Sequence, residues 1–136
     1  MLKEGLDLYL PLVDDDAIDV VICRPDGKFV TVQIKARSKD VIEGDAALFA
    51  AIPHEIRENC WWVFYSERMD VTWIMTSREF VKASVQNKTG KNKGRRSIWF
   101  NGTRRDKYNT GKREEYCKPQ FERFIAKDFR RLLRLS

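Results

Sequence analysis

The sequence is poor in the residues that most often build metal centres and covalent cross-links. It has one histidine, His54, which excludes nucleases that hold a metal between paired histidines. Its three cysteines, Cys23, Cys60 and Cys117, are odd in number and form no C-x-x-C motif. We therefore expect free thiols in a protein of the reducing cytoplasm, rather than a disulfide framework or a zinc site.

Long apolar runs are equally scarce. No segment approaches the ~18–20 apolar residues of a membrane-spanning helix, so we expect no membrane partner of that kind. The first residues lack the charged start and apolar stretch of a signal peptide. The glycines and lysines of 90–97 do not have the G-x-x-x-x-G-K-[ST] spacing of a P-loop, which excludes that class of nucleotide site.

The sequence does contain enough apolar material for one core. Its 136 residues are 43% apolar and 12% aromatic, including four Trp and eight Phe. These values exclude a disordered chain. The length is that of one domain, which we expect to span 1–136.

The charge of the chain is distributed unevenly. The formal net charge of +6 divides into −5 over residues 1–86, with 10 basic and 15 acidic residues, and +11 over 87–136, with 16 basic and 5 acidic residues. The densest part is 87–113, where ten basic residues accompany one acid. Asparagines and aromatics interleave with these charges. Because Lys and Arg neutralise phosphates and aromatic rings stack on bases, this segment predicts contact with nucleic acid, most simply DNA.

The side chains that we expect to hold the phosphate backbone are all basic. They are Lys88, Lys91, Lys93, Arg95 and Arg96, with Arg104 and Arg105 as a second patch. A solvated face and a basic surface for an acidic protein partner are the alternatives. An anionic membrane surface is disfavoured, because the segment has no amphipathic helical period.

The hydrophobic patterning predicts a mixed sheet with flanking helices. Alternation with a period of two marks strands, Gly and Pro mark turns, and Thr76-x-x-Glu79 is a capping box that opens a helix. In chain order we expect strands over 6–12, 17–23 and 28–36 with turns at 14–16 and 25–27, a polar loop over 38–45, a short helical turn over 46–52, strands over 60–66 and 71–75, a helix from Thr76 to Gln86, a short strand over 97–101, and a last helix from Pro119. The first three strands form an antiparallel meander, and the next two form a hairpin. The fold class is therefore α+β (mixed α/β).

The tryptophans divide into two groups in this scheme. Trp61, Trp62 and Trp73 lie in apolar strands, and we expect them in the core. Trp99 has basic neighbours and is the tryptophan that we single out as exposed, with a core position as the alternative.

Asp19, Gln33 and Lys35 form the constellation that could carry chemistry. Asp19 lies in an apolar strand, where a carboxylate without a partner is costly. On the next strand, the period of two puts Gln33 and Lys35 on one face. A hairpin brings the three side chains onto one sheet surface. The alternatives are a salt bridge between Asp19 and Lys35 across the hairpin, and a solvated strand face for Gln33.

Such a trio suits metal-assisted phosphodiester hydrolysis. The side-chain oxygens of Asp19 and Gln33, with the backbone oxygen of Ile34, are hard ligands that suit Mg²⁺ or Mn²⁺. A metal there stabilises charge on a phosphate and lowers the pKa of a bound water. Lys35 would orient that water or offset the developing negative charge.

At these residues the sequence resembles the PD-(D/E)XK nuclease superfamily. The matching pattern is Ile18-Asp19 followed by Gln33-Ile34-Lys35, with 13 residues between Asp19 and Gln33. The run V-Q-I-K-A-R is similar to members that have Gln in place of the middle acid. The superfamily includes restriction enzymes, Holliday junction resolvases and some intron-encoded homing endonucleases. The resemblance implies a restriction-endonuclease-like central sheet, Mg²⁺-dependent cleavage of DNA, and a homo-oligomer of two or more copies.

Two departures accompany this resemblance. The family usually begins with a helix that often bears a glutamate of the metal site, whereas this sequence starts almost at its first strand, with Glu4 as the candidate. The middle position, Gln33, carries no charge. The alternative to an active nuclease is therefore a catalytically inactive DNA- or RNA-binding module of the same fold.

Overall fold

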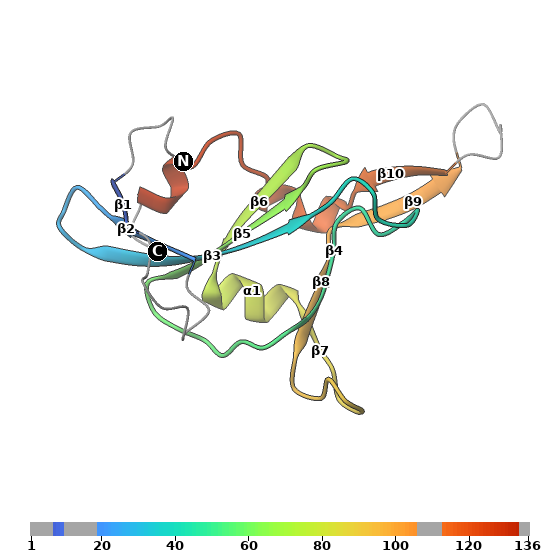
Figure 1. Ribbon diagram of the computed structural model, residues 1–136, viewed down its shortest axis with the longest axis horizontal. Coiled ribbons are helices and arrows are strands. Elements are labelled where there is room, and N and C mark those ends of the chain that lie inside the picture. The colour runs from blue at the N-terminus through green and yellow to red at the C-terminus, as the bar shows by residue number, and fades with distance from the viewer. Residues whose placement is uncertain (1–6, 10–18, 106–112, 134–136) are drawn as a thin grey trace.

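A computed structural model describes residues 7–9, 19–105 and 113–133, and a five-stranded mixed sheet lies at its centre (Figure 1). The strand order is β1-β2-β3-β5-β6, and neighbours are antiparallel except for the parallel pair β3 and β5. The strands are β1 (Asp7–Tyr9), β2 (Val20–Cys23), β3 (Phe29–Arg37), β5 (Cys60–Ser66) and β6 (Val71–Thr76). The predicted mixed α+β class is confirmed, with few helices.

The predicted meander at the start of the chain is confirmed in β1, β2 and β3. The turn between β2 and β3 is tight, because Gly27 adopts a φ of +83° that a residue with a side chain rarely adopts. Asp26 supports the turn by accepting the backbone N–H of Lys28 at 2.9 Å. The other residues of the predicted first strand and the acidic turn at 14–16 lie outside the described residues.

Two smaller sheets extend from the central one (Figure 1). The first has the order β4-β8-β7, and the second pairs β9 with β10. Their strands are β4 (Leu48–Ile52), β7 (Val85–Gln86), β8 (Arg96–Trp99), β9 (Asn101–Arg105) and β10 (Arg113–Cys117). The chain passes from β8 through Phe100 directly into β9, so the predicted strand over 97–101 is in fact divided between two sheets.

The prediction of a helical turn over 46–52 is wrong. Residues Leu48–Ile52 form β4, in which Leu48 pairs with Trp99 and Phe49 with Ile98 of β8. The register then shifts, and Ala51 takes a φ of +56°. Pairing with a strand about 50 residues away overrides the helical preference of the local alanines.

The predicted capping box is confirmed, but its helix is shorter than expected. The Thr76 side chain accepts the N–H of Glu79, and the Glu79 carboxylate accepts the N–H of Thr76, which opens α1 (Ser77–Ala83). The helix ends at Ala83, because the next residues pair with β8 as strand β7.

The prediction of a single last helix from Pro119 is also wrong. The segment contains two 3₁₀ helices, η2 (Pro119–Phe124) and η3 (Arg130–Leu133), and Ile125 forms a bridge to Trp73 of β6 between them. Phe121 and Phe124 belong to one hydrophobic cluster and Leu132 to another. One straight helix presents its apolar stripe in one direction, whereas this segment covers two clusters.

The core lies on both faces of β5 and β6. One cluster gathers Trp62, Phe64, Trp73 and Met75 with residues of α1, β4 and β8, and the other gathers Trp61, Val63 and Ile74 with Leu132 of η3. The predictions that 60–66 is covered on both faces and that Trp61, Trp62 and Trp73 are core residues are therefore confirmed. Within the described ranges, no helix is long and apolar enough to cross a membrane.

Candidate functional site

Asp19 lies immediately before β2 and is attached to the backbone of β3. Its N–H donates to Val32 O at 3.0 Å, and its carboxylate oxygen Oδ2 accepts the N–H of Ile34 at 2.7 Å. The Asp19 side chain is exposed rather than buried in a strand. These two bonds place the carboxylate at the position where β2 stops covering β3.

Gln33 is the buried member of the predicted trio, with 3% of its surface exposed. It pairs with Trp62 on one side, and continuation of the β2–β3 register puts Asp19 opposite it on the other. Burial raises the pKa of the nearby Cys60 thiol, and hydrogen bonding from Thr31 and from Gln33 opposes that rise. The alternative of a solvated strand face for Gln33 is thus wrong.

Lys35 is two residues further along β3, on the same face as Gln33, and its side chain is exposed. Among the residues that the structure describes, no ion pair joins Lys35 to Asp19. The hairpin salt bridge considered from the sequence is therefore not formed. The Lys35 ammonium remains available to a ligand on this face.

The oxygen donors at this point suit a hard cation. The second oxygen of the Asp19 carboxylate, Oδ1, accepts no hydrogen bond from the described residues. In a strand, the N–H and C=O of one residue point to the same side, so the Ile34 carbonyl is directed to the side on which Asp19 binds the Ile34 N–H. With the Gln33 amide oxygen, the ligand set predicted from the sequence has one charged and two neutral oxygens of the kind that Mg²⁺ prefers.

Further acidic ligands for such a cation are not found in the described part of the chain. There, no group of three or more His, Cys, Asp or Glu side chains is placed to hold a metal ion. The sequence candidate Glu4 and the acidic turn predicted at 14–16 lie outside the described residues. The site that can be described therefore has a single carboxylate.

Most of the predicted phosphate-binding side chains gather on the turn between β7 and β8, which projects from the body of the molecule (Figure 1). Lys88, Lys93 and Arg95 are exposed, and so is Lys91. Within the described ranges, none of these four side chains forms an ion pair with an acid. The turn is therefore an uncompensated positive surface, which we call the basic turn (Lys88, Lys91, Lys93 and Arg95).

The remaining predicted side chains are placed differently. Arg96 is half-buried and donates to Val81 O at 3.0 Å, so it binds the end of α1 rather than projecting into solvent. Arg104 and Arg105 lie at the far end of β9, on the second projecting ribbon. Arg104 is 3.5 Å from a Glu114 carboxylate oxygen and lies over the Tyr116 ring.

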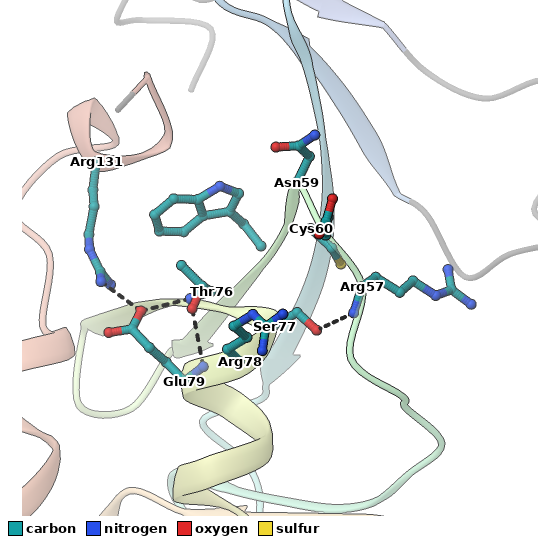
Figure 2. Close-up of a pocket in the computed structure, with 10 residues that line it drawn as sticks. Arg57, Asn59, Cys60, Thr76, Ser77, Arg78, Glu79 and Arg131 are labelled. Atoms are coloured by element: carbon teal, nitrogen blue, oxygen red, sulfur yellow. Dashed lines mark hydrogen bonds and ion pairs between the residues drawn. The ribbon is translucent and has the colours of Figure 1, made fainter. Parts of the chain in front are cut away.

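A cavity of 630 Å³ opens where β5 begins, β6 ends and α1 starts (Figure 2). Figure 2 shows Arg131 reaching across it to Glu79, whose carboxylate oxygen lies 2.6 Å from the Arg131 nitrogen Nη2. Arg131 also donates to Ile74 O and lies over the Trp61 ring. This network attaches η3 to the capping box of α1, and local pattern does not predict it, because Arg131 and Glu79 lie 52 residues apart in the sequence.

His54 lies next to Ser77, which lines this cavity, and it is held by contacts within the fold. Its Nε2 is 2.6 Å from the Ser77 hydroxyl, which accepts the N–H of Arg57 and can therefore give its own proton to the imidazole. The ring contacts Trp62 and Phe80 edge-on. Burial lowers the pKa of His54 from 6.5 to about 4, and the charges of Arg57 and Arg96 act in the same direction.

We expect His54 to make folding stability depend on pH. The unfolded chain takes up a proton near pH 6.5 and the folded chain only near pH 4, so this part of the stability is complete above 6.5 and declines as the pH falls towards 4. Because the ring is half exposed and screened, we expect a loss of about 1 kcal/mol. The measurement is the free energy of urea unfolding across this range, in wild type and His54→Gln. An equal dependence on pH in both proteins would contradict the assignment.

Comparison with known proteins gives little to set beside this geometry. No protein-family model matches the chain, and no curated protein matches it. A solved structure of a bacterial homing endonuclease, I-Ssp6803I, is similar with a TM-score of 0.44 and 19% sequence identity, over 70% of this chain and 77% of that chain. A likeness at this level assigns neither a family nor an activity to the chain.

Proposed function

We propose that this chain binds DNA and hydrolyses its phosphodiester bonds with Mg²⁺ or Mn²⁺ held at Asp19. The observation that carries the proposal is the hydrogen bond from the Ile34 N–H to the Asp19 carboxylate. This bond fixes the negative charge of Asp19 opposite Gln33, on the face of the sheet that also carries Lys35. The chain would then be a divergent member of the PD-(D/E)XK superfamily, with Gln in place of the middle acid.

Each residue of the site has a role that follows from its chemistry. Asp19, the Gln33 amide oxygen and the Ile34 carbonyl would hold the metal, with substrate phosphate and water completing its shell. The metal supplies stabilisation of phosphate charge and a water of lowered pKa. Lys35 is exposed and carries three N–H donors, so it can bind a phosphate oxygen and offset charge that develops there.

The grip on the polyanion is assigned to the basic turn, with Arg105 on the second ribbon. These side chains are exposed and carry charge that no described acid compensates. Each phosphate that they neutralise releases a counterion, which makes the affinity fall as salt rises. Arg96 and Arg104 already have partners in the fold, so we assign them a smaller share.

Replacing all four residues of the basic turn by Gln should reduce the salt dependence of DNA binding. Up to four phosphate contacts are lost, and the slope of log K against log salt should become shallower by roughly 0.9 for each contact. The measurement is fluorescence anisotropy of a labelled duplex over a range of salt concentrations. The affinity at low salt should fall in parallel.

A matched variant replaces four exposed lysines on other parts of the molecule, so that the net charge changes equally. These are Lys28, Lys39, Lys82 and Lys127. We expect this variant to keep most of the wild-type slope. Equal losses in the two variants would show that net charge, and not the basic turn, holds the DNA.

The test of hydrolysis is the cleavage of supercoiled plasmid and of branched DNA in Mg²⁺ or Mn²⁺, with EDTA as the blank. Wild-type protein should nick or linearise DNA only with the metal. A homo-oligomer in which each copy cuts one strand of a duplex is part of the proposal, and it rests on the family resemblance alone. Protein that cuts nothing while binding DNA would overturn the catalytic part alone.

That outcome would identify the second candidate function, a DNA- or RNA-binding module without catalysis. One observation favours it: among the described residues, the site has a single carboxylate, and Gln33 is buried beside the Cys60 thiol. One carboxylate binds Mg²⁺ more weakly than two. Wild-type protein that binds DNA with the expected salt dependence, but does not cleave it in the presence of the metal, would identify the chain as a binding module without catalysis.

A further inference from the structure

Trp99 is the one tryptophan of this chain that solvent reaches substantially. Its exposed fraction is 42%, against 2% for Trp61 and 0% for Trp62 and Trp73. It is the last residue of β8, next to the route into the second ribbon. Large exposed aromatic side chains are enriched where a protein binds a partner, so the surroundings of Trp99 need an explanation.

The exposed indole is held rigidly from beneath. Its Nε1–H donates to Gly44 O at 3.0 Å and to Asn101 Oδ1 at 2.9 Å. Asn101 is itself fully buried and accepts the N–H of Ala47 at 2.9 Å. The polar edge of the ring is therefore satisfied inside the protein, and what remains for solvent is its apolar surface.

A cleft of 300 Å³ lies along this indole, on the outward face of the β4-β8-β7 sheet. Leu48, Val85 and Ser97 share the face, because Leu48 pairs with Trp99 and Val85 with Ser97. Val85 is 70% exposed. The Lys118 ammonium lies 5.1 Å from the centre of the indole ring and adds a positive charge to a largely apolar cleft, which Gln120 also lines.

The basic turn belongs to the same small sheet, because it joins β7 to β8. One sheet thus presents an aromatic cleft with a lysine and, at its end, four cations that no described acid compensates. The complementary ligand has flat apolar groups attached to a chain of negative charges. A second copy of this chain fits less well, since each copy carries a net charge of +6.

We propose that the Trp99 cleft is a stacking site for an unpaired nucleobase, belonging to a strand whose phosphates lie along the basic turn. This rests on the proposed nucleic-acid binding and names the part of the substrate that is read there. A base inside a perfect duplex has both faces covered by its neighbours. The cleft therefore selects single-stranded, bulged or frayed nucleic acid, and the base takes the place of Lys118 on the ring and leaves that ammonium to a phosphate.

Two variants at Trp99 isolate the aromatic face. Trp99→Leu and Trp99→Phe both lose the hydrogen bonds of Nε1, but only Phe keeps a ring on which a base can stack. Affinity for a labelled single strand should fall roughly 5- to 100-fold in Trp99→Leu and less than about threefold in Trp99→Phe. Affinity for a blunt duplex should stay near the wild-type value in both.

Fluorescence of the wild-type protein gives a second readout that does not depend on variants. Because the other three tryptophans are buried, acrylamide quenches Trp99 selectively, and a single strand should protect it while a blunt duplex does not. Equal binding of single strands by Trp99→Leu and Trp99→Phe, or binding without protection, would overturn this inference alone. Protection that appears with protein concentration in the absence of DNA would overturn it in favour of a contact between copies. Failure of wild type to bind any nucleic acid would overturn the proposed function as well.

Discussion

Asp19→Asn should abolish metal-dependent cleavage while leaving the fold and DNA binding intact. In the wild-type protein the Ile34 N–H donates to Asp19 Oδ2 at 2.7 Å. The Oδ1 of an asparagine can accept the same N–H, so the backbone keeps this hydrogen bond. What is lost is the one negative charge that the described site offers to a cation. Since a bound metal contributes several kcal/mol to the transition state, we expect the cleavage rate to fall roughly 10³-fold or more.

The hairpin itself provides a matched control for this variant. Asp26 also accepts a backbone N–H, that of Lys28 at 2.9 Å, but it lies in the turn at the opposite end of the β2–β3 pair. Asp26→Asn makes the same chemical change away from Gln33 and Lys35. Both variants are compared with wild type for plasmid cleavage and, separately, for duplex affinity.

The two variants should differ in cleavage and agree in binding. Asp26→Asn should cut within about twofold of wild type, since it touches no group of the proposed site. If Asp19→Asn cuts as fast as Asp26→Asn, the activity does not depend on a cation at Asp19 and the assignment is wrong. A loss of both cleavage and binding in Asp19→Asn would instead show that this carboxylate supports the fold.

Phe100→Ala should cause the largest loss of stability of any substitution considered for this chain. Phe100 has no exposed surface and stacks on Trp73 with ring centroids 4.5 Å apart. It also contacts the rings of Phe64 and Phe121, at 5.2 and 5.1 Å. Removing the ring leaves a cavity among aromatics that cannot close over it, and such truncations cost about 3–5 kcal/mol.

Urea unfolding followed by circular dichroism measures this loss, and two variants accompany it. Phe29→Ala makes the same truncation at a side chain that is 54% exposed, and we expect it to cost below about 1 kcal/mol. Phe100→Leu retains most of the volume and should cost about 1–2 kcal/mol, which keeps the comparison measurable if the alanine variant does not fold. Equal losses for Phe100→Ala and Phe29→Ala would show that Phe100 is not central to the core.

Local patterns in the sequence were sufficient for the elements whose partners are close in the chain. The β2–β3 hairpin, the β5–β6 hairpin and the capping box at Thr76 all follow from turn residues and alternation within about 20 residues. The face shared by Gln33 and Lys35 follows from the same period of two. Their convergence with Asp19 on a metal remains a prediction that the experiments above address.

The local sequence pattern did not predict elements whose partners are distant in the chain. Strand β4 exists because β8 pairs with it, and nothing within 46–52 indicates a partner near Trp99. The chain after Pro119 shows helical spacing, yet its apolar residues divide between two clusters that only the assembled sheet defines. Arg96 was predicted to bind phosphate because it follows other basic residues in the sequence. Its hydrogen bond to the Val81 carbonyl depends on where α1 packs, which the local sequence does not indicate.

The passage of the chain through Phe100 has a mechanical consequence. Strands β8 and β9 follow each other with that one buried residue between them, and each carries a positively charged arm. The two arms, which are the β7–β8 and β9–β10 hairpins, therefore start from one buried residue in the aromatic core, and the fold sets the distance between them. We expect a ligand that matches this distance to be bound at little cost in chain entropy, whereas a ligand of another width must itself deform in order to contact both arms.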